Sequence, residues 1–129
     1  MEQQYLKLLR RLLESPVRET RNGPVHSYFS YHITHDMYGG FPLLTTKKMF
    51  WKGVIEELSW FLRGCTDVQQ LRDKGVHIWD GNTKDRDWDA GPIYGWQWRH
   101  WGAEYKDKDT DYTGQGNDQI ARVLHLLKN

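Results

Sequence analysis

The chain has 129 residues, 18 basic and 17 acidic, so its formal net charge is +1 at pH 7. This balance excludes the clustered basic excess of nucleic-acid-binding proteins, and we predict no dedicated nucleic-acid site. The single cysteine, Cys65, excludes an internal disulfide and a CxxC metal site, and no apolar run reaches the roughly 20 residues of a membrane helix. The charged start, MEQQYLKLLRRLLE, lacks the apolar core of a secretory signal, so we expect a soluble, cytoplasmic protein.

The first part of the chain predicts one amphipathic helix and one strand. Tyrosine and leucine recur at helical spacing over residues 3–14, and Pro16 ends that helix. Residues 18–26, RETRNGPVH, have the composition of a loop. Residues 27–34, SYFSYHIT, are aromatic and β-branched, which is typical of a strand. Residues 41–48, FPLLTTKK, form a short extended segment after a turn.

The second part is mainly helical. Apolar residues recur at helical spacing over residues 51–63, and Gly64 closes that helix. Asp67 can cap a short helix that ends at Gly75, and residues 119–128 form a last amphipathic helix. The pattern predicts one α+β domain over the whole chain. A sheet with one visible strand leaves its edges unpaired, so we expect more chain or a partner to complete it.

A tryptophan-rich block over residues 78–105 indicates a ligand site. Five of the seven tryptophans lie in it, among glycines, acids and the polar residues Gln97, Arg99 and His100. Aromatic faces beside convergent polar groups suit a flat, polar small molecule.

Several residues have a functional and a structural interpretation, and the sequence pattern leaves both open. Glu57 lies at the margin of an apolar helix face, where a partly desolvated carboxylate suits proton transfer. The spacing alone favours a solvated helix flank, since structural carboxylates outnumber catalytic ones. Tyr94 could relay a proton or line the core, and Trp79 could stack on a planar ring or fill the core. Arg21 and Lys47 could bind an anion or face solvent.

Neither a nucleophile nor a metal site is predicted. Cys65 has no histidine near it in the sequence, which argues against a nucleophilic thiol. The six histidines lack the HxxxH and HExxH spacings of metal sites.

Five ordered blocks together resemble thymidylate synthase. They are FPLLTTKK at 41–48, FWKGVIEELSWFLRG at 50–64, KGVHIWD at 74–80, GPIYGWQWRHWGAEY at 91–105 and DYTGQGNDQIARVL at 111–124. The last block is similar to the animal-type branch in particular. The resemblance extends over essentially the whole chain.

The resemblance implies a fold, an activity and partners. Thymidylate synthases are methyltransferases of nucleotide biosynthesis that convert dUMP to dTMP, with 5,10-methylene-tetrahydrofolate as co-substrate and no metal. The fold is an α/β (α+β) type with a mixed sheet flanked by helices, and the enzymes are homodimers. The chain is therefore expected to bind dUMP and a reduced folate.

The resemblance also assigns roles to individual residues. Arg21 would hold the dUMP phosphate. Glu57 would be the general acid and base that organises water around the pyrimidine and the folate, and Tyr94 would join the proton network. Folate would be held by Lys47, Phe50, Ile78, Trp79 and Asn82.

Two departures from the family pattern affect the expected function. The phosphate loop, RTGTGT in the family, is Arg21-Asn22-Gly23-Pro24-Val25-His26 here, and Pro24 removes a backbone donor. The catalytic cysteine of the family, in a Pro-Cys-His context, is not among these residues, and Cys65 does not match it. We therefore expect an amino-terminal part of the domain, incomplete at its C-terminal end and inactive as residues 1–129 alone.

Two other functions stay open on the sequence. The chain could be a non-catalytic relic that binds a nucleotide or folate, or that acts as a partner of a full-length synthase. A pyrimidine nucleotide hydroxymethylase is a weaker alternative.

Overall fold

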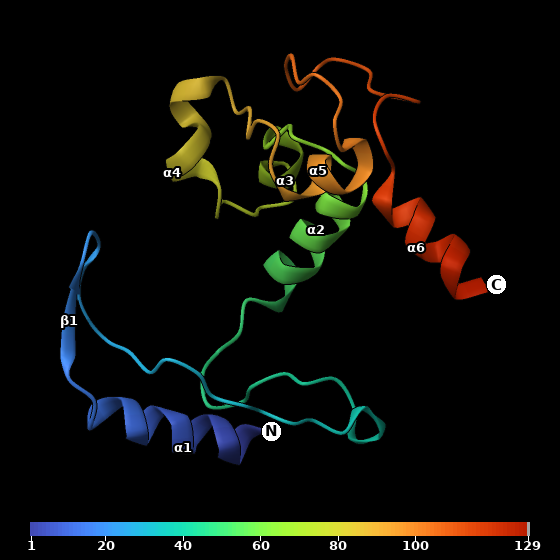
Figure 1. Cartoon of the computed structure of the whole chain (residues 1–129). Helices are drawn as coiled ribbons and strands as arrows, with labels where there is room; N and C mark the ends of the chain where they lie inside the picture. Colours follow the sequence, from blue (N-terminus) through green and yellow to red (C-terminus); the bar gives the residue numbers. More distant parts are fainter. Residues whose placement is uncertain (129) are drawn as a thin grey trace. The chain divides into compact units, whose positions relative to one another are not determined.

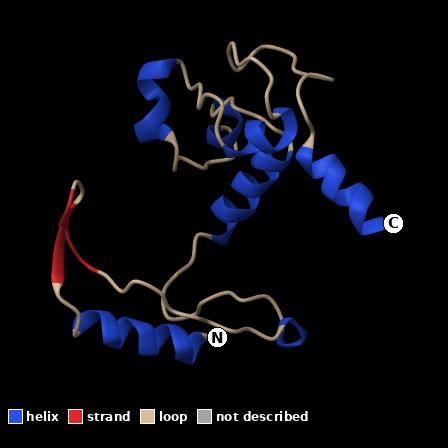
Figure 2. Ribbon diagram, in the orientation of Figure 1, coloured by secondary structure: helices blue, strands red, loops and turns tan. Residues whose placement is uncertain are grey.

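The computed structural model describes residues 1–128 and divides into two compact units. Met1–Met49 form the first unit and Phe50–Asn129 the second. Figure 1 gives the element labels and Figure 2 distinguishes helices from strands.

The first unit begins with the predicted amphipathic helix. Helix α1 spans Glu2–Leu13, as predicted from the leucine spacing. The Glu2 carboxylate accepts hydrogen bonds from the backbone amides of Thr45 and Thr46, at 2.7 and 2.9 Å. The Thr45 hydroxyl also donates to this carboxylate, and its hydrogen bond, followed by those of the two amides, lowers the pKa of Glu2. These hydrogen bonds attach the residues after a short 3₁₀ turn, Met37–Gly39, to the start of α1.

A β-hairpin occupies the segment that the sequence predicted to be a loop. Strand β1 (Val17–Thr20) pairs antiparallel with β2 (Gly23–His26), and Arg21 and Asn22 form the two-residue turn. Gly23 has φ +100°, which is accessible mainly to glycine. The prediction failed because both strands are almost wholly exposed, so they carry no apolar alternation.

The strand predicted over residues 27–34 is wrong: this segment has no strand in the structure. The Gln4 side-chain amide donates to the Thr34 C=O and accepts from the Thr34 N–H, at 2.9 Å each. A side chain thus bonds the backbone groups that a neighbouring strand would bond. Within residues 1–128 the sheet has only the two antiparallel strands β1 and β2. A few helices with a small antiparallel sheet make the fold class α+β, as predicted.

The second unit is helical. Its elements are α2 (Trp51–Leu62), α3 (Gln69–Arg72), α4 (Asp80–Thr83), a 3₁₀ turn η2 (Lys84–Arg86), α5 (Tyr94–His100) and α6 (Gln119–Lys128). The long helices α2 and α6 confirm the predicted ones. Gly64 and Gly75 follow the first two helices with φ +71° and +73°, so both are helix ends that favour glycine.

The core of the second unit lies between α2, α3 and the segment before α5. Its buried residues are Trp60, Val68, Leu71, Val76 and Ala90. The Trp60 side chain is wholly buried, and its indole N–H donates to the Asp67 carbonyl at 3.0 Å. This bond satisfies the one polar atom that the ring brings into the core.

Helices α2 and α5 approach each other closely at Gly95. A Cβ atom at this position would lie 2.5 Å from the Cα and 2.6 Å from the carbonyl oxygen of Phe61. Only glycine permits this backbone contact. The crossing places Tyr94, the first residue of α5, beside Phe61 in the last turn of α2.

Candidate functional site

A hydrogen bond joins two of the predicted site residues. The indole Nε1 of Trp79 donates to Oε1 of Glu57 at 2.8 Å. Glu57 lies on α2, and Trp79 lies just before α4. Both side chains are partly buried, and among residues 1–128 Trp79 is the only hydrogen-bond partner of this carboxylate. The carboxylate keeps unused acceptor capacity for a water molecule or a ligand.

The neighbouring glutamate has a different environment. Glu56 forms an ion pair with Lys74, with 2.5 Å between Oε2 and Nζ. The hydrogen bond from Lys74 lowers the pKa of Glu56. The two adjacent glutamates therefore have different partners: Glu56 is bound by the cation of Lys74, whereas Glu57 accepts from the uncharged indole of Trp79. Glu57 is the better placed of the two for proton transfer.

Aromatic rings surround the Glu57–Trp79 pair. The Tyr94 ring lies 6.5 Å from the Trp79 ring and 5.5 Å from the Phe61 ring, with nearly edge-on geometry against Phe61. Trp79 also contacts the rings of Trp60 and Phe61. Tyr94 is 60% exposed, and its hydroxyl has no hydrogen-bond partner in the described part of the chain. Its phenol is therefore free to donate to a molecule bound on this surface.

Three of the remaining predicted residues lie in the same unit. Ile78, beside Trp79, is 52% exposed, and Asn82 lies exposed on α4. Phe50 precedes α2, and its half-exposed ring covers Gly53 so closely that a Cβ atom there would lie 2.4 Å from the ring. Ile78 and Asn82 are within three residues of Trp79 and share its local segment, whereas Phe50 is seven residues before Glu57 on the chain.

The two predicted anion-binding residues belong to the other unit. Arg21 lies exposed in the turn of the β-hairpin, and Lys47 lies exposed after the Thr45–Thr46 contact with α1. The structure thus brings together Glu57, Trp79 and Tyr94 in the second unit, while Arg21 and Lys47 are placed in the first.

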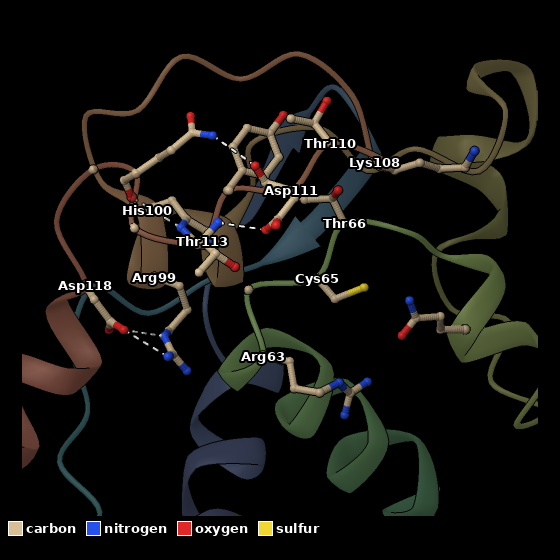
Figure 3. A pocket seen from close by; sticks show the side chains of 16 residues that line it. Arg63, Cys65, Thr66, Arg99, His100, Lys108, Thr110, Asp111, Thr113 and Asp118 are labelled. Atoms are coloured by element: carbon tan, nitrogen blue, oxygen red, sulfur yellow. Dashed lines mark hydrogen bonds and ion pairs between the residues drawn. The ribbon is translucent and has the colours of Figure 1, made fainter.

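A separate cavity of about 670 Å³ lies near the C-terminal end of α2 (Figure 3). None of the predicted site residues lines it. Two of its cations form ion pairs: Arg99 bonds Asp118, another lining residue, at 2.8 Å, and Lys108 bonds Asp87, which is outside the lining, at 2.9 Å. Because two of the lining cations are already paired, we place the candidate site at Glu57 and Trp79, where a carboxylate without a cation partner lies beside the partly buried Trp79 ring.

The half-buried thiol of Cys65 lines this cavity. Burial raises its pKa, so the protonated and weakly nucleophilic form dominates at neutral pH. Within residues 1–128, no group of three His, Cys, Asp or Glu side chains could hold a metal ion. No helix in the same range is long and apolar enough to cross a bilayer.

Sequence reasoning missed Arg72 and Asp80, an ion pair that supports the site. Arg72 forms an ion pair with Asp80, the residue after Trp79, and its guanidinium lies over the Trp88 ring. Arg72 precedes Asp80 by eight residues, across a helix end, so neither helical nor strand periodicity predicts this ion pair. Trp101, in the same tryptophan-rich block, is 57% exposed.

Comparison with known proteins matches a family model described as thymidylate synthase over residues 3–129. The chain is 45% identical to a thymidylate synthase of Homo sapiens, over 98% of the chain and 45% of that protein. It is 46% identical to a thymidylate synthase of Ascaris suum, over 99% of the chain and 48% of the relative. A bifunctional dihydrofolate reductase-thymidylate synthase of Glycine max is 44% identical, over 96% of the chain and 26% of the relative. The chain thus spans less than half the length of these relatives.

Proposed function

The chain belongs to the thymidylate synthase family, and we propose that it supplies the folate-binding and proton-transfer side of an enzyme that methylates dUMP to dTMP. The observation that carries the proposal is the hydrogen bond from Trp79 to Glu57 beside the exposed Tyr94. It joins an aromatic face to a carboxylate with free acceptor capacity. Such a pair suits a flat heterocycle whose ring atoms exchange protons.

Each group has a defined task in this proposal. The pterin ring of 5,10-methylene-tetrahydrofolate lies against Trp79 and Ile78, and Asn82 supplies a polar contact. Phe50 and Lys47 bind other parts of the folate, and Lys47 faces its anionic tail. Lys47 belongs to the first unit, so its part in the folate site is a prediction from the family pattern.

Glu57 moves protons through water between the folate and the pyrimidine, and the Tyr94 phenol extends this network. Arg21 holds the phosphate of dUMP, because a guanidinium matches phosphate oxygens with two parallel hydrogen bonds. The exposed position of Arg21 at a hairpin turn leaves its side chain free to do so.

Residues 1–129 do not contain the nucleophile of this reaction. Their single cysteine is Cys65, whose thiol is half-buried and has a raised pKa. We therefore propose that these residues alone do not turn over dUMP, and that activity requires a polypeptide part carrying a nucleophilic thiol. We also propose one synthase domain over the chain, a homodimeric assembly and a cytoplasmic location.

Binding of a reduced folate tests the proposal on the chain itself. The probe is 5-formyltetrahydrofolate, a stable reduced folate, titrated calorimetrically with dUMP present. Trp79→Ala should weaken binding by about tenfold or more, since stacking on an aromatic face contributes about 1–3 kcal/mol. Trp101→Ala, at a half-exposed tryptophan outside the site, should leave binding unchanged. Equal affinity of the Trp79→Ala variant and the wild type would refute the folate surface.

A further inference from the structure

We infer that Arg72 is a positioning residue that clamps both ends of the segment 80–88 and so aims Trp79 at Glu57. The Arg72 Nη1 atom lies 2.5 Å from Oδ2 of Asp80, at the start of the segment. The same guanidinium lies 3.7 Å from the centre of the Trp88 ring, at its end. One side chain on α3 thus holds two points that are eight residues apart.

The far end of the segment has a backbone that needs such support. Asp87 and Trp88 both have positive φ, at +51° and +59°, which is uncommon for residues with a side chain and an outlier for a bulky one. The Trp88 N–H donates to the Thr83 carbonyl at 3.0 Å, and the Trp88 carbonyl accepts from the Val68 N–H at 2.9 Å. These bonds and the guanidinium together hold a strained conformation.

The near end of the segment fixes Trp79. Asp80 follows Trp79 directly, and the Trp79 carbonyl accepts hydrogen bonds from the Asn82 N–H at 3.0 Å and from the Thr83 hydroxyl at 2.9 Å. The Trp79 backbone is therefore tied to the turn that Arg72 clamps. Since the indole reaches Glu57 from this backbone, the clamp sets the length of the Trp79–Glu57 hydrogen bond. The importance of that bond for folate chemistry rests on the proposed function.

The Arg72–Asp80 pair is arranged for placement and contributes little to stability. It joins one nitrogen to Asp80 Oδ2, which also lies 3.2 Å from His77 Nδ1. In the described part of the chain Arg72 Nε and Asp80 Oδ1 are buried without a hydrogen-bond partner. An ion pair with unsatisfied atoms gains little over its desolvation. Loss of Arg72 should therefore release the segment and leave the core folded.

Hydrogen exchange at the tryptophan indoles tests this inference on the chain. Trp79 Nε1–H is followed by ¹⁵N NMR, and a Trp79→Phe variant assigns its signal. Trp60 Nε1–H, which bonds the Asp67 carbonyl in the core, is the internal reference. Arg72→Met should raise the Trp79 exchange rate by about tenfold through local opening, with the Trp60 rate unchanged. Arg63→Met, at an exposed arginine bonded to Ser59, is the matched control and should change neither rate.

Two results would overturn the inference: a Trp79 rate that Arg72→Met leaves unchanged, or Trp79 and Trp60 rates that rise together. If Arg72→Met does not fold, Arg72→Lys is measured, which keeps the charge for Asp80 but lacks the flat face over Trp88. It should give an intermediate Trp79 rate, and a rate equal to that of the wild type would contradict the clamp. Binding of 5-formyltetrahydrofolate is tested separately. Faster Trp79 exchange with unchanged folate affinity would support the clamp and count against the folate surface.

Discussion

The indole of Trp79 donates a 2.8 Å hydrogen bond to the carboxylate of Glu57, which lies 22 residues earlier on a different helix. The bond connects the tryptophan-rich block to the one apolar helix that carries two adjacent glutamates. It fixes one oxygen of the carboxylate and leaves the other available. Proton transfer to a bound molecule requires such an oriented, partly buried and accessible group.

The coupling between these two residues can be measured as a stability difference. Trp79→Phe keeps an aromatic ring and removes the N–H, so it should destabilise the chain in urea unfolding. In a double-mutant cycle with Glu57→Leu, which removes the acceptor, the coupling should be about 1.5–3 kcal/mol, typical of a hydrogen bond to a charged group. Trp98→Phe is the control, because Trp98 also contacts the Phe61 ring edge-on but has no comparable bond to Glu57. Additive effects of Trp79→Phe and Glu57→Leu would show that the bond is absent in solution.

Gly95 is predicted to resist replacement because α2 and α5 cross closely at this residue. Gly95→Ala would put a Cβ atom 2.5 Å from the Phe61 backbone and push α5 away from α2. We expect a loss of about 2–3 kcal/mol in the free energy of unfolding, as for overpacked cores. Gly81→Ala, at a helical position with open space around it, should leave stability unchanged or raise it by up to about 1 kcal/mol. Equal stability of the two variants would contradict the close crossing.

Tyr105 predicts a loss of stability at alkaline pH. Burial, together with its hydrogen bond to Asp89, raises the pKa of the Tyr105 phenol above its ordinary value of 10.0. The unfolded phenol therefore loses its proton first. The stabilising contribution is complete below about pH 10 and is lost as pH rises through the folded pKa.

The free energy of unfolding should thus fall above about pH 10 in the wild type, and Tyr105→Phe should make this fall smaller. Tyr105→Phe should also be less stable at pH 7, because Asp89 loses its donor and the Thr66 hydroxyl loses its hydrogen-bond partner. Urea unfolding checks both effects when it is measured from about pH 8 to about pH 11, because this range brackets the ordinary pKa of a phenol. Tyr38→Phe, at a fully exposed tyrosine, should keep the wild-type pH dependence. If Tyr105→Phe keeps the wild-type pH dependence, the alkaline loss of stability does not come from the Tyr105 phenol.

Helices were predictable from the sequence because their apolar faces recur at helical spacing. The predicted spans of α2 and α6 agree with the structure to within one residue, and Gly64 and Gly75 mark helix ends. The β-hairpin was missed because its strands are exposed and have no apolar alternation. The strand predicted over 27–34 failed because composition alone does not supply a neighbouring strand.

The candidate site was predictable in part. Glu57 and Trp79 were singled out separately, but a hydrogen bond between residues 22 positions apart follows from tertiary packing and leaves no local pattern. Glu56 and Glu57 differ in the structure because Lys74 forms an ion pair with Glu56 and not with Glu57. The sequence pattern does not show this difference. Arg72 had no signal at all, because its partners Asp80 and Trp88 lie on an irregular segment.

The most direct test of the account compares the two adjacent glutamates in a polypeptide that carries this chain together with the nucleophilic thiol. The measurement is tritium release from 5-tritiated dUMP with 5,10-methylene-tetrahydrofolate. Glu57→Gln should lower the rate by about 100-fold or more, as expected when a general acid and base is removed. Glu56→Gln, which removes only an exposed ion pair with Lys74, should change it by less than about twofold. Similar rates for Glu57→Gln and Glu56→Gln would contradict the role of Glu57 and with it the proposed site.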